Sequence, residues 1–177
     1  MPHPVLAEYL AARDKIDAAV RTIAERRKDD LACEKGCARC CVAGLSVLSV
    51  EAFAIQEHLD ERGLSATPSP APGGCAFLDE EGACTLYEAR PVLCRTHGLP
   101  IRLAASDEER PARRSLRVLD DAEVCELNFT ERAPAPADVL DGERLSALLL
   151  VVEQRFREAA GLEGSYERVA LEALVPE

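Results

Sequence analysis

Apolar and polar positions follow a helical period at the start of the chain. Pro4 fits the first turn of such a helix, and charged side chains occupy the positions between the apolar ones. The apolar residues at helical spacing are Leu6, Tyr9, Leu10, Ile16, Val20 and Ile23. The pattern predicts one amphipathic helix from Pro4 to Asp30 that packs through its apolar side.

Two further helices are predicted from the residues at their ends. Ser49 can cap a helix that runs to Arg62, where Gly63 would end it. Asp141 can cap a helix of about five turns that ends at Gly161. The second of these helices carries an apolar stripe, formed by Leu145, Leu148, Leu149, Val152 and Phe156.

The segments between these helices predict shorter elements. After an apolar stretch at Leu45–Val50, a hairpin is predicted over Cys75–Cys84 around the turn signal Asp79–Gly82. A helical turn is expected to begin at Tyr87, with Pro91 in its first turn. The last short elements are a strand over Ser115–Leu119 that leads to Cys125 and a helix over Tyr166–Leu174.

Two stretches are predicted to be loops. Proline and glycine dominate residues 67–74, and charged residues dominate residues 105–114. The elements together predict a mainly α fold, with helices packed around a small, irregular, cysteine-rich metal-binding centre and one short β-hairpin. Residues 1–30 form the packing helix of this fold, residues 31–127 the cysteine-cluster domain, and residues 128–177 a helical segment on the same core.

The composition combines few aromatic residues with many cysteines. The chain has 177 residues, which suits one domain, and 47% of them are hydrophobic, yet only 4 Phe, 3 Tyr and 0 Trp are present. Large rings bury the most area per residue, so the core must be built mainly from Ala, Leu and Val. Against this thin core stand 8 cysteines.

The charge excludes two classes of function. With 21 basic and 32 acidic residues, the net charge of −11 argues against a nucleic-acid groove and against a basic membrane-binding patch. No run reaches the roughly 18–20 apolar residues of a membrane span, and the first residues lack the basic region of a secretory signal. We therefore expect a cytoplasmic protein, in which Asn128-Phe-Thr130 is not a glycosylation site and cysteines are metal ligands or redox thiols.

The first cysteine block has the spacing of a metal site. Cys33-x3-Cys37-x2-Cys40-Cys41 places four thiols within one short stretch, and Gly36 permits the tight turn. Ligands two to four residues apart can wrap a zinc ion or an iron–sulfur cluster. Neighbouring cysteines rarely bond each other without strain, and their side chains diverge, so Cys40 and Cys41 need not face the same metal atom.

The other four cysteines can complete the ligand set. Eight thiols allow one four-cysteine site with spare thiols, two such sites, or a thiolate-bridged cluster, and the sequence does not choose among them. Cys125 is the least constrained by its neighbours. The predicted ligands are Cys33, Cys37, Cys40, Cys41, Cys75, Cys84, Cys94 and Cys125.

Basic side chains beside the cysteines can offset the charge of the thiolates. Arg90 and Arg95 are predicted to lie around the metal ligands, and Lys35 and Arg39 are close in sequence. His97 has a workable ligand spacing from Cys94, but a surface or outer position is favoured for it. His58, on a predicted helix, and His3, near the terminus, are expected to be ordinary residues.

The two cysteine blocks resemble those of a known family. Cys33-x3-Cys37-x2-Cys40-Cys41, followed by Cys75-x8-Cys84-Thr-Leu-Tyr87-Glu-Ala-Arg90-Pro91-Val-Leu-Cys94-Arg95, is similar to the CxxCxxCC family of YkgJ-like cysteine-cluster proteins. The resemblance covers residues 33–97 and departs from the family's name pattern by one extra residue between Cys33 and Cys37. It implies a zinc- or iron-chelating domain, and flagellin lysine N-methylases carry a similar cluster.

The predicted function is a cytoplasmic metal-binding protein that holds zinc or an iron–sulfur cluster through these thiolates. One alternative is a cluster-dependent enzyme, methylase-like or oxidative. The Cys33–Cys40 spacing looks like the radical S-adenosylmethionine motif, but no aromatic residue precedes Cys40 and no β/α barrel pattern appears. The other alternative is a thiol redox or metal-handling protein. A protein partner, the oligomeric state and any substrate are left open.

Overall fold

The architecture is taken from a computed structural model, which describes residues 4–34, 36–63, 73–103 and 115–175. Within these ranges the chain forms four α-helices and two small sheets, so the fold is mixed α/β and not mainly α as predicted. The helices are α1 (Pro4–Arg26), α2 (Ser49–Arg62), α3 (Val92–Thr96) and α4 (Gly142–Ala160). None of these helices is both long and apolar enough to cross a bilayer.

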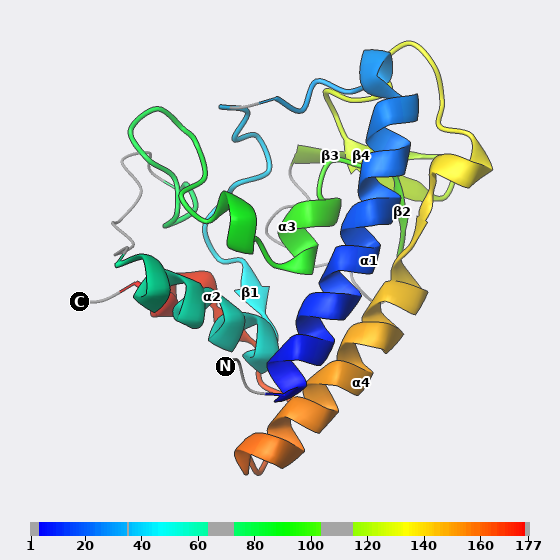
Figure 1. Cartoon of the computed structure of the whole chain (residues 1–177). Helices are drawn as coiled ribbons and strands as arrows, with labels where there is room; N and C mark the ends of the chain where they lie inside the picture. Colours follow the sequence, from blue (N-terminus) through cyan, green and yellow to red (C-terminus); the bar gives the residue numbers. More distant parts are fainter. Residues whose placement is uncertain (1–3, 35, 64–72, 104–114, 176–177) are drawn as a thin grey trace.

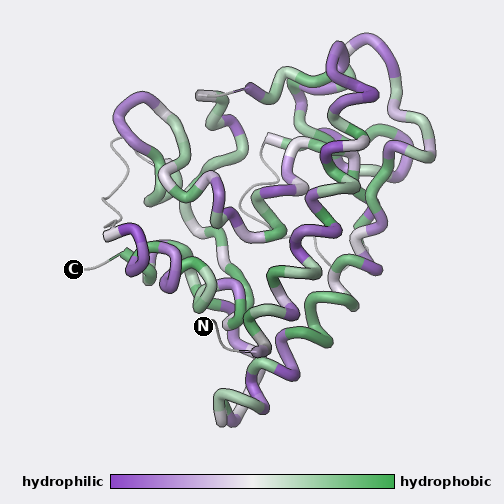
Figure 2. Tube along the Cα trace, in the orientation of Figure 1, coloured by the Kyte–Doolittle hydropathy of each residue, from purple (hydrophilic) through white to green (hydrophobic). Residues whose placement is uncertain are grey.

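The long helices pack on one another. Helices α1 and α4 run side by side, and α2 crosses near one end of the pair (Figure 1). Figure 2 shows apolar residues spaced among polar ones along α1 and in a longer run along α4. The buried cluster between them consists of Leu6, Tyr9, Ala12, Ile16, Leu48, Val50, Val92, Val152 and Phe156. This cluster contains no cysteine, so the helices pack through aliphatic and aromatic side chains and the cysteine-rich segments lie beside them.

Two buried carboxylates cap helices in this core. Glu153 of α4 accepts hydrogen bonds from the backbone N–H of Ser49 (3.2 Å) and Val50 (2.9 Å), at the start of α2. Glu51 accepts from the N–H of Leu48 (3.1 Å) and of Val92 (2.9 Å), the first residue of α3. Backbone N–H groups in the first turn of a helix have no partner within the helix, and these carboxylates satisfy them. Glu153 thereby fixes the start of α2 to α4, and Glu51 fixes the start of α3 to α2.

Some of the predicted helix boundaries are confirmed, and others differ from the prediction. Asp141 caps α4 by accepting from the N–H of Arg144 (3.0 Å), and Gly161 ends it at φ 65°, as predicted. Helix α1 stops at Arg26 and is followed by a 3₁₀ turn at Lys28–Asp30. Ser49 is the first helical residue of α2 instead of its cap, because the carboxylate of Glu51 caps the backbone one residue earlier, at Leu48.

The C-terminal segment corrects one prediction. Instead of a helix over Tyr166–Leu174, the chain forms strand β6 (Val169–Ala170) and a 3₁₀ turn at Leu171–Leu174. Strand β6 pairs antiparallel with β1 (Ser46–Val47). The pairing buries Leu171 in a second apolar cluster, which decides the local structure where the helical pattern is too short to do so.

The second sheet has four strands in the order β3-β4-β2-β5. Its members are β2 (Ile101–Arg102), β3 (Leu116–Leu119), β4 (Ala122–Cys125) and β5 (Leu140–Asp141). The predicted strand over Ser115–Leu119 is therefore confirmed as β3, which pairs antiparallel with β4 so that Leu116 lies opposite Cys125. Strands of two residues carry no periodicity, so β2 and β5 could not be predicted.

The predicted hairpin over Cys75–Cys84 is reduced to a tight loop. Leu78 and Cys84 form one isolated antiparallel bridge, and the carboxylate of Asp79 accepts from the N–H of Glu81 (3.0 Å) and Ala83 (2.8 Å). The helical turn expected at Tyr87 divides into a 3₁₀ turn and α3, and Pro91 is the N-cap of α3. Most of the predicted loop 67–74, and all of the loop 105–114, lie outside the described residues.

The second apolar cluster joins α2 to the cysteine segments. Its buried residues include Ile55 and Leu59 from α2, Phe77 and Leu86 beside the cysteines, and Leu171 from the C-terminal segment. The thiol of Cys75 belongs to the same cluster, and Cys41 and Cys84 pack against it. The cysteine-rich segments are thus held by apolar contacts on one side.

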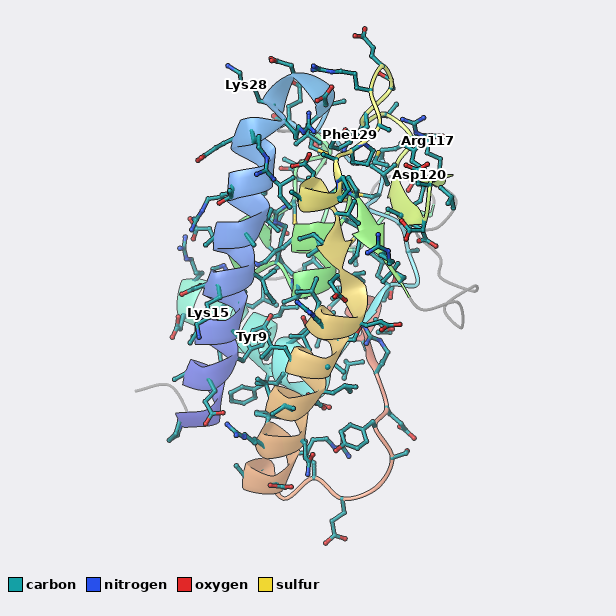
Figure 3. The ribbon with its side chains drawn as sticks, turned by 90° about the vertical axis from the view of Figure 1, so that its right-hand side faces the viewer. Tyr9, Lys15, Lys28, Arg117, Asp120 and Phe129 are labelled. Carbon is teal, nitrogen blue, oxygen red and sulfur yellow. The ribbon has the colours of Figure 1, made fainter. Side chains whose placement is uncertain are left out.

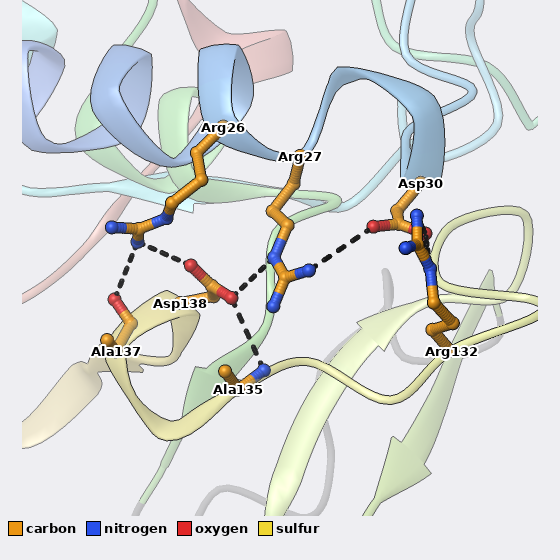
Figure 4. A network of polar contacts seen from close by, with 7 residues as sticks. All are labelled: Arg26, Arg27, Asp30, Arg132, Ala135, Ala137 and Asp138. Atoms are coloured by element: carbon orange, nitrogen blue, oxygen red, sulfur yellow. Dashed lines mark hydrogen bonds and ion pairs between the residues drawn. The ribbon is translucent and has the colours of Figure 1, made fainter.

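An ion-pair network around the buried carboxylate of Asp138 fixes the end of α1 to the segment before α4 (Figure 4). The carboxylate of Asp138 is 1% exposed and accepts from Arg27 Nε (2.6 Å), while Arg26 pairs with its other oxygen. Arg132 pairs with Asp30 in the same region at 3.2 Å. Burial acts to raise the pKa of Asp138, but the hydrogen bonds from Arg27 and Arg26 outweigh it and hold that pKa below its usual value.

We expect Asp138→Asn to lower the free energy of unfolding by about 2 kcal/mol at pH 7, because two guanidinium groups lose their anion. A depressed carboxyl pKa stabilises the folded state above its unfolded value of 3.8, and that gain is lost as the pH falls further. The difference between wild type and variant, measured by urea denaturation, should therefore shrink below about pH 4. Asp141→Asn is the matched control, since asparagine also caps helices and the site is exposed; equal losses in the two variants would contradict the role given to Asp138.

Candidate metal centre

The eight cysteines come from four segments of the chain. Cys33, Cys37, Cys40 and Cys41 lie in the irregular stretch between α1 and β1, Cys75 and Cys84 in the tight loop, Cys94 in α3, and Cys125 at the end of β4. Every one of them is a free thiol. Cys75 and Cys125 are buried, Cys33 is exposed, and the others are half-buried.

Cys33, Cys37 and Cys125 form a first group. The thiol of Cys33 interacts electrostatically with those of Cys37 and Cys125, and Cys125 interacts with Cys37. Two contacts join these segments across the fold. Arg39 pairs with Glu126, the residue after Cys125. The side-chain amide of Asn128 donates to the sulfur of Cys33 at 3.2 Å.

Cys41, Cys75, Cys84 and Cys94 form a second group. Cys41 interacts electrostatically with Cys75 and Cys94, and Cys94 interacts with Cys75 and Cys84. The N–H of Cys75 donates to the carbonyl of Cys41 at 3.0 Å, and a bridge pairs the next residues along, Val42 and Gly74. Backbone pairing thus holds the first cysteine block against the second, while the bond from Val92 to Glu51 fixes the helix that carries Cys94.

Cys40 lies between the two groups. It interacts with Cys33 and Cys125 on one side and with Cys41 and Cys94 on the other. A hydrogen bond from the thiol of Cys41 lowers the pKa of Cys40 to about 7, and Arg90 acts in the same direction. Cys40 is therefore more readily ionised near neutral pH than its neighbours Cys33, Cys41 and Cys94, and the thiolate is the form that binds metal.

Other thiols of the two groups are held in the protonated form. Burial raises the pKa of Cys94, Cys75 and Cys84 in the second group, and of Cys33 and Cys125 in the first. Burial thus disfavours the ionisation of several of these thiols at the same time. A metal ion that binds here displaces these protons and supplies the positive charge that burial otherwise denies.

Arg90 and Arg95, which were predicted to lie around the metal ligands, make different contacts. Arg90 interacts with Cys40, Cys84 and Cys94, and its guanidinium lies 3.9 Å above the centre of the Tyr87 ring. Arg95 pairs with Asp17 of α1 and donates to the carbonyl of Arg90. Arg90 is thus a cation beside the thiols, and Arg95 holds the segment that carries it. Lys35 lies outside the described residues.

The described residues do not form a closed ligand shell. Within those ranges, no three cysteine, histidine, aspartate or glutamate side chains converge closely enough to hold a metal ion. The thiols gather in two groups without reaching a common point, and thiolates are the ligands that both zinc and iron–sulfur clusters accept. His97 follows α3 and lines a cavity, His58 is half-buried on α2, and His3 lies outside the description.

The pattern of one protein family spans this whole arrangement. The CxxCxxCC family, described as a "putative zinc- or iron-chelating domain", matches residues 32–126, which is more than half of the chain and includes all eight cysteines. The chain belongs to this family. Neither the curated proteins nor the solved structures contain a match to it. In this CxxCxxCC chain the match extends beyond the two blocks that carried the resemblance and takes in Cys125.

Two residues beside the cysteines were not predicted as part of the site. Asn128 stood out only as the start of a glycosylation sequence, yet its side chain is fully buried against Cys33. Gly98 has φ 92°, and a Cβ there would lie 3.0 Å from the sulfur of Cys33 and 3.3 Å from the Asn128 amide nitrogen. A glycine soon after a cysteine block is the only signal in the sequence for such close approach.

We expect Gly98→Ala to disturb the first group. Alanine pays about 1–2 kcal/mol for the left-handed backbone, and crowding of Cys33 should add about 1 kcal/mol to the loss of unfolding free energy. Gly164→Ala is the control, because Gly164 has φ 99° and nothing within 4 Å of its Cβ position. Thermal unfolding and bound metal are measured for both variants. Equal stability and equal metal content in the two would show that Gly98 has no steric role at Cys33.

Proposed function

We propose that this CxxCxxCC domain binds zinc or iron in two neighbouring sites of four thiolates each. The first site consists of Cys33, Cys37, Cys40 and Cys125, and the second of Cys41, Cys75, Cys84 and Cys94. The observations that carry the proposal are the contacts that bring the cysteine segments together, namely the Cys75 N–H to Cys41 carbonyl bond and the Arg39–Glu126 pair, with Cys40 interacting with thiols on both sides.

Four thiolates suit both metals that the family description names. Zinc in structural sites takes four ligands in a tetrahedron, commonly all cysteine, and iron–sulfur clusters are also held by four thiolates. Assigning the adjacent Cys40 and Cys41 to different metals means that neither metal has to take two consecutive side chains. It places the two proposed sites next to each other, where the Cys40 and Cys41 thiols are in contact. This division also uses every cysteine of the chain.

The charges near the sites are consistent with bound metal. Four thiolates around one divalent ion leave a net charge of −2, so two such sites need nearby cations. Arg90 lies beside Cys40, Cys84 and Cys94, where it can offset part of this charge. Its stacking on Tyr87 and the hydrogen bond from its Nε to the Tyr87 carbonyl (3.2 Å) keep the guanidinium in place.

Within this proposal, the metal stabilises the cysteine segments more than the helices. The cluster between α1, α2 and α4 contains no cysteine, whereas the described residues within 32–44 and 73–86 have almost no regular structure. Ligand bonds are then the strongest contacts that these segments make. Metal binding contributes folding free energy wherever the ligands are unstructured without it.

A cavity favours a second candidate, a chemically active centre. It measures about 460 Å³ and lies against α3, where Leu93 and His97 line it. Cys94 follows Leu93 in the same helix, so α3 carries one thiol of the second group beside a residue that lines a space of the size that small ligands occupy. This arrangement would suit a redox or substrate-converting role, and the tests below separate it from a structural one.

Metal analysis of anaerobically purified protein tests the two sites. Zinc should appear at two ions per chain in a colourless protein; iron with acid-labile sulfide and a brown colour would indicate clusters. Cys37→Ser should remove the metal of the first site and Cys84→Ser that of the second, so each variant keeps about half of the bound metal.

Ala38→Ser is the control for these variants, because it adds a hydroxyl group to the same turn and removes no ligand. It should keep the full metal content. Wild-type protein that is folded and free of metal would contradict the proposed function. Loss of all metal from both cysteine variants would instead indicate a single shared cluster.

Removal of the metal tests which part of the chain depends on it. After chelation, residues 32–44 and 73–86 should lose protection in hydrogen–deuterium exchange, while α1 and α4 keep theirs. Added zinc, or iron under anaerobic conditions, should restore the protection. If the metal leaves and returns with no change in exchange anywhere, a redox or metal-handling role is favoured. Unfolding of α1 and α4 would contradict the separation of the helical core from the metal sites.

A further inference from the structure

Asn128 is a buried polar residue that the proposed ligand set does not use. It follows β4, lies outside residues 32–126 of the family match, and is 0% exposed. Its side-chain oxygen accepts from the N–H of Ala32 at 2.8 Å. Its side-chain nitrogen donates to the carbonyl of Gly98 at 2.6 Å and to the sulfur of Cys33 at 3.2 Å.

These partners fix which way the amide points. The N–H of Ala32 requires an oxygen, and the carbonyl of Gly98 requires an N–H donor, so the amide cannot be reversed without losing both bonds. One amide hydrogen is used by Gly98, and the other is directed at Cys33. The sulfur therefore faces a donor that is set by the surrounding backbone.

The turn that carries Asn128 is itself anchored from two directions. The N–H of Phe129 donates to the carbonyl of Asp30 at 2.7 Å, after the end of α1. Arg117 of β3 donates to the carbonyls of Asn128 and Phe129, both at 2.7 Å. Figure 3 shows Arg117 and Phe129 close together, at the opposite end of the molecule from Tyr9. Asn128 thus has little freedom to follow Cys33 if that residue moves.

Cys33 needs such an anchor more than the other cysteines. It is the exposed one, lies in no helix or strand, and is separated from Cys37 by one residue more than the family's name pattern has. A metal-bound thiolate is a stronger hydrogen-bond acceptor than a thiol, and hydrogen bonds to ligand sulfur tune the affinity and the potential of metal sites.

We propose that Asn128 is a positioning residue of the first metal site, which orients Cys33 and stabilises its metal-bound thiolate through the amide hydrogen bond. This inference rests on the proposed function. It also gives the buried Asn128, which begins the Asn128-Phe-Thr130 sequence, a role that does not involve modification.

Asn128→Asp tests the proposal with a change of nearly equal size. The carboxylate keeps an acceptor for the N–H of Ala32 but presents an acceptor, instead of a donor, to Cys33. In competition with a chelator, zinc at the first site should be retained about 10–100-fold less well, while the second site is unaffected. With cobalt in place of zinc, the sulfur-to-metal absorption of the first site should also shift.

Arg117→Met is the matched control, because it loosens the same turn without touching the sulfur. It should lower thermal stability and leave the metal affinity and the cobalt spectrum unchanged. In a Cys33→Ser background, Asn128→Asp should cost no further metal, because the residue acts through Cys33. If Asn128→Asp does not fold, Asn128→Ser, which is too short to reach the sulfur, replaces it.

Two outcomes overturn the inference. Asn128→Asp could bind metal with unchanged affinity and spectrum, or Arg117→Met could lose as much metal as Asn128→Asp, which would make the role of Asn128 structural. Both outcomes require wild-type protein that holds metal. Wild type without metal contradicts the proposed function itself, so the two failures are distinguishable.

Discussion

The buried carboxylate of Glu51 makes the connection on which the rest of the arrangement depends. It caps the start of α2 by accepting from the N–H of Leu48, and it also accepts from the N–H of Val92. It thereby fixes the start of the short helix that carries Cys94 to the helical core. A five-residue helix is not stable alone, so its position must come from outside. Burial raises the pKa of Glu51, but backbone N–H groups at two helix starts favour its charged form. One side chain thus links apolar packing to the cysteine-rich region.

One apolar cluster of the protein lies between the long helices, and a separate one lies beside the cysteine segments. Helices α1, α2 and α4 bury aliphatic side chains and the few aromatic ones against each other, and this explains how a chain with so few rings keeps a stable body. The cysteine segments pack only one side against a separate cluster that contains Phe77 and Leu171. The expectation that the helices gather around the cysteine centre is therefore met only where α2 and α3 approach it. The thiols lie beside the helical core, and those of Cys41, Cys75 and Cys84 contact this second cluster.

The sequence predicted the features that repeat or that have a local chemical signal. The ends of α4 follow from Asp141 and Gly161, the strand β3 from the short apolar run at Ser115–Leu119, and the cysteine blocks from their spacing. It could not predict β2, β5 and β6, since two-residue strands exist only through partners far along the chain. For the same reason the division of the thiols into two groups was left open, because it depends on backbone pairing between Cys41 and Cys75. Asn128 was missed as a neighbour of Cys33 because the sequence does not show whether an asparagine side chain is buried or exposed.

The grouping of the cysteines also has a consequence for the order of events during synthesis. The second group is complete once α3 has left the ribosome, whereas the first group must wait for Cys125 and for the turn at Asn128. Closing a longer loop adds little to the entropic cost, because that cost grows only with the logarithm of length. The first group therefore forms later than the second, although closing its longer loop costs little more free energy. During this delay, Cys33 and Cys37 lack the fourth ligand of their proposed site, whereas all four thiols of the second group are already present.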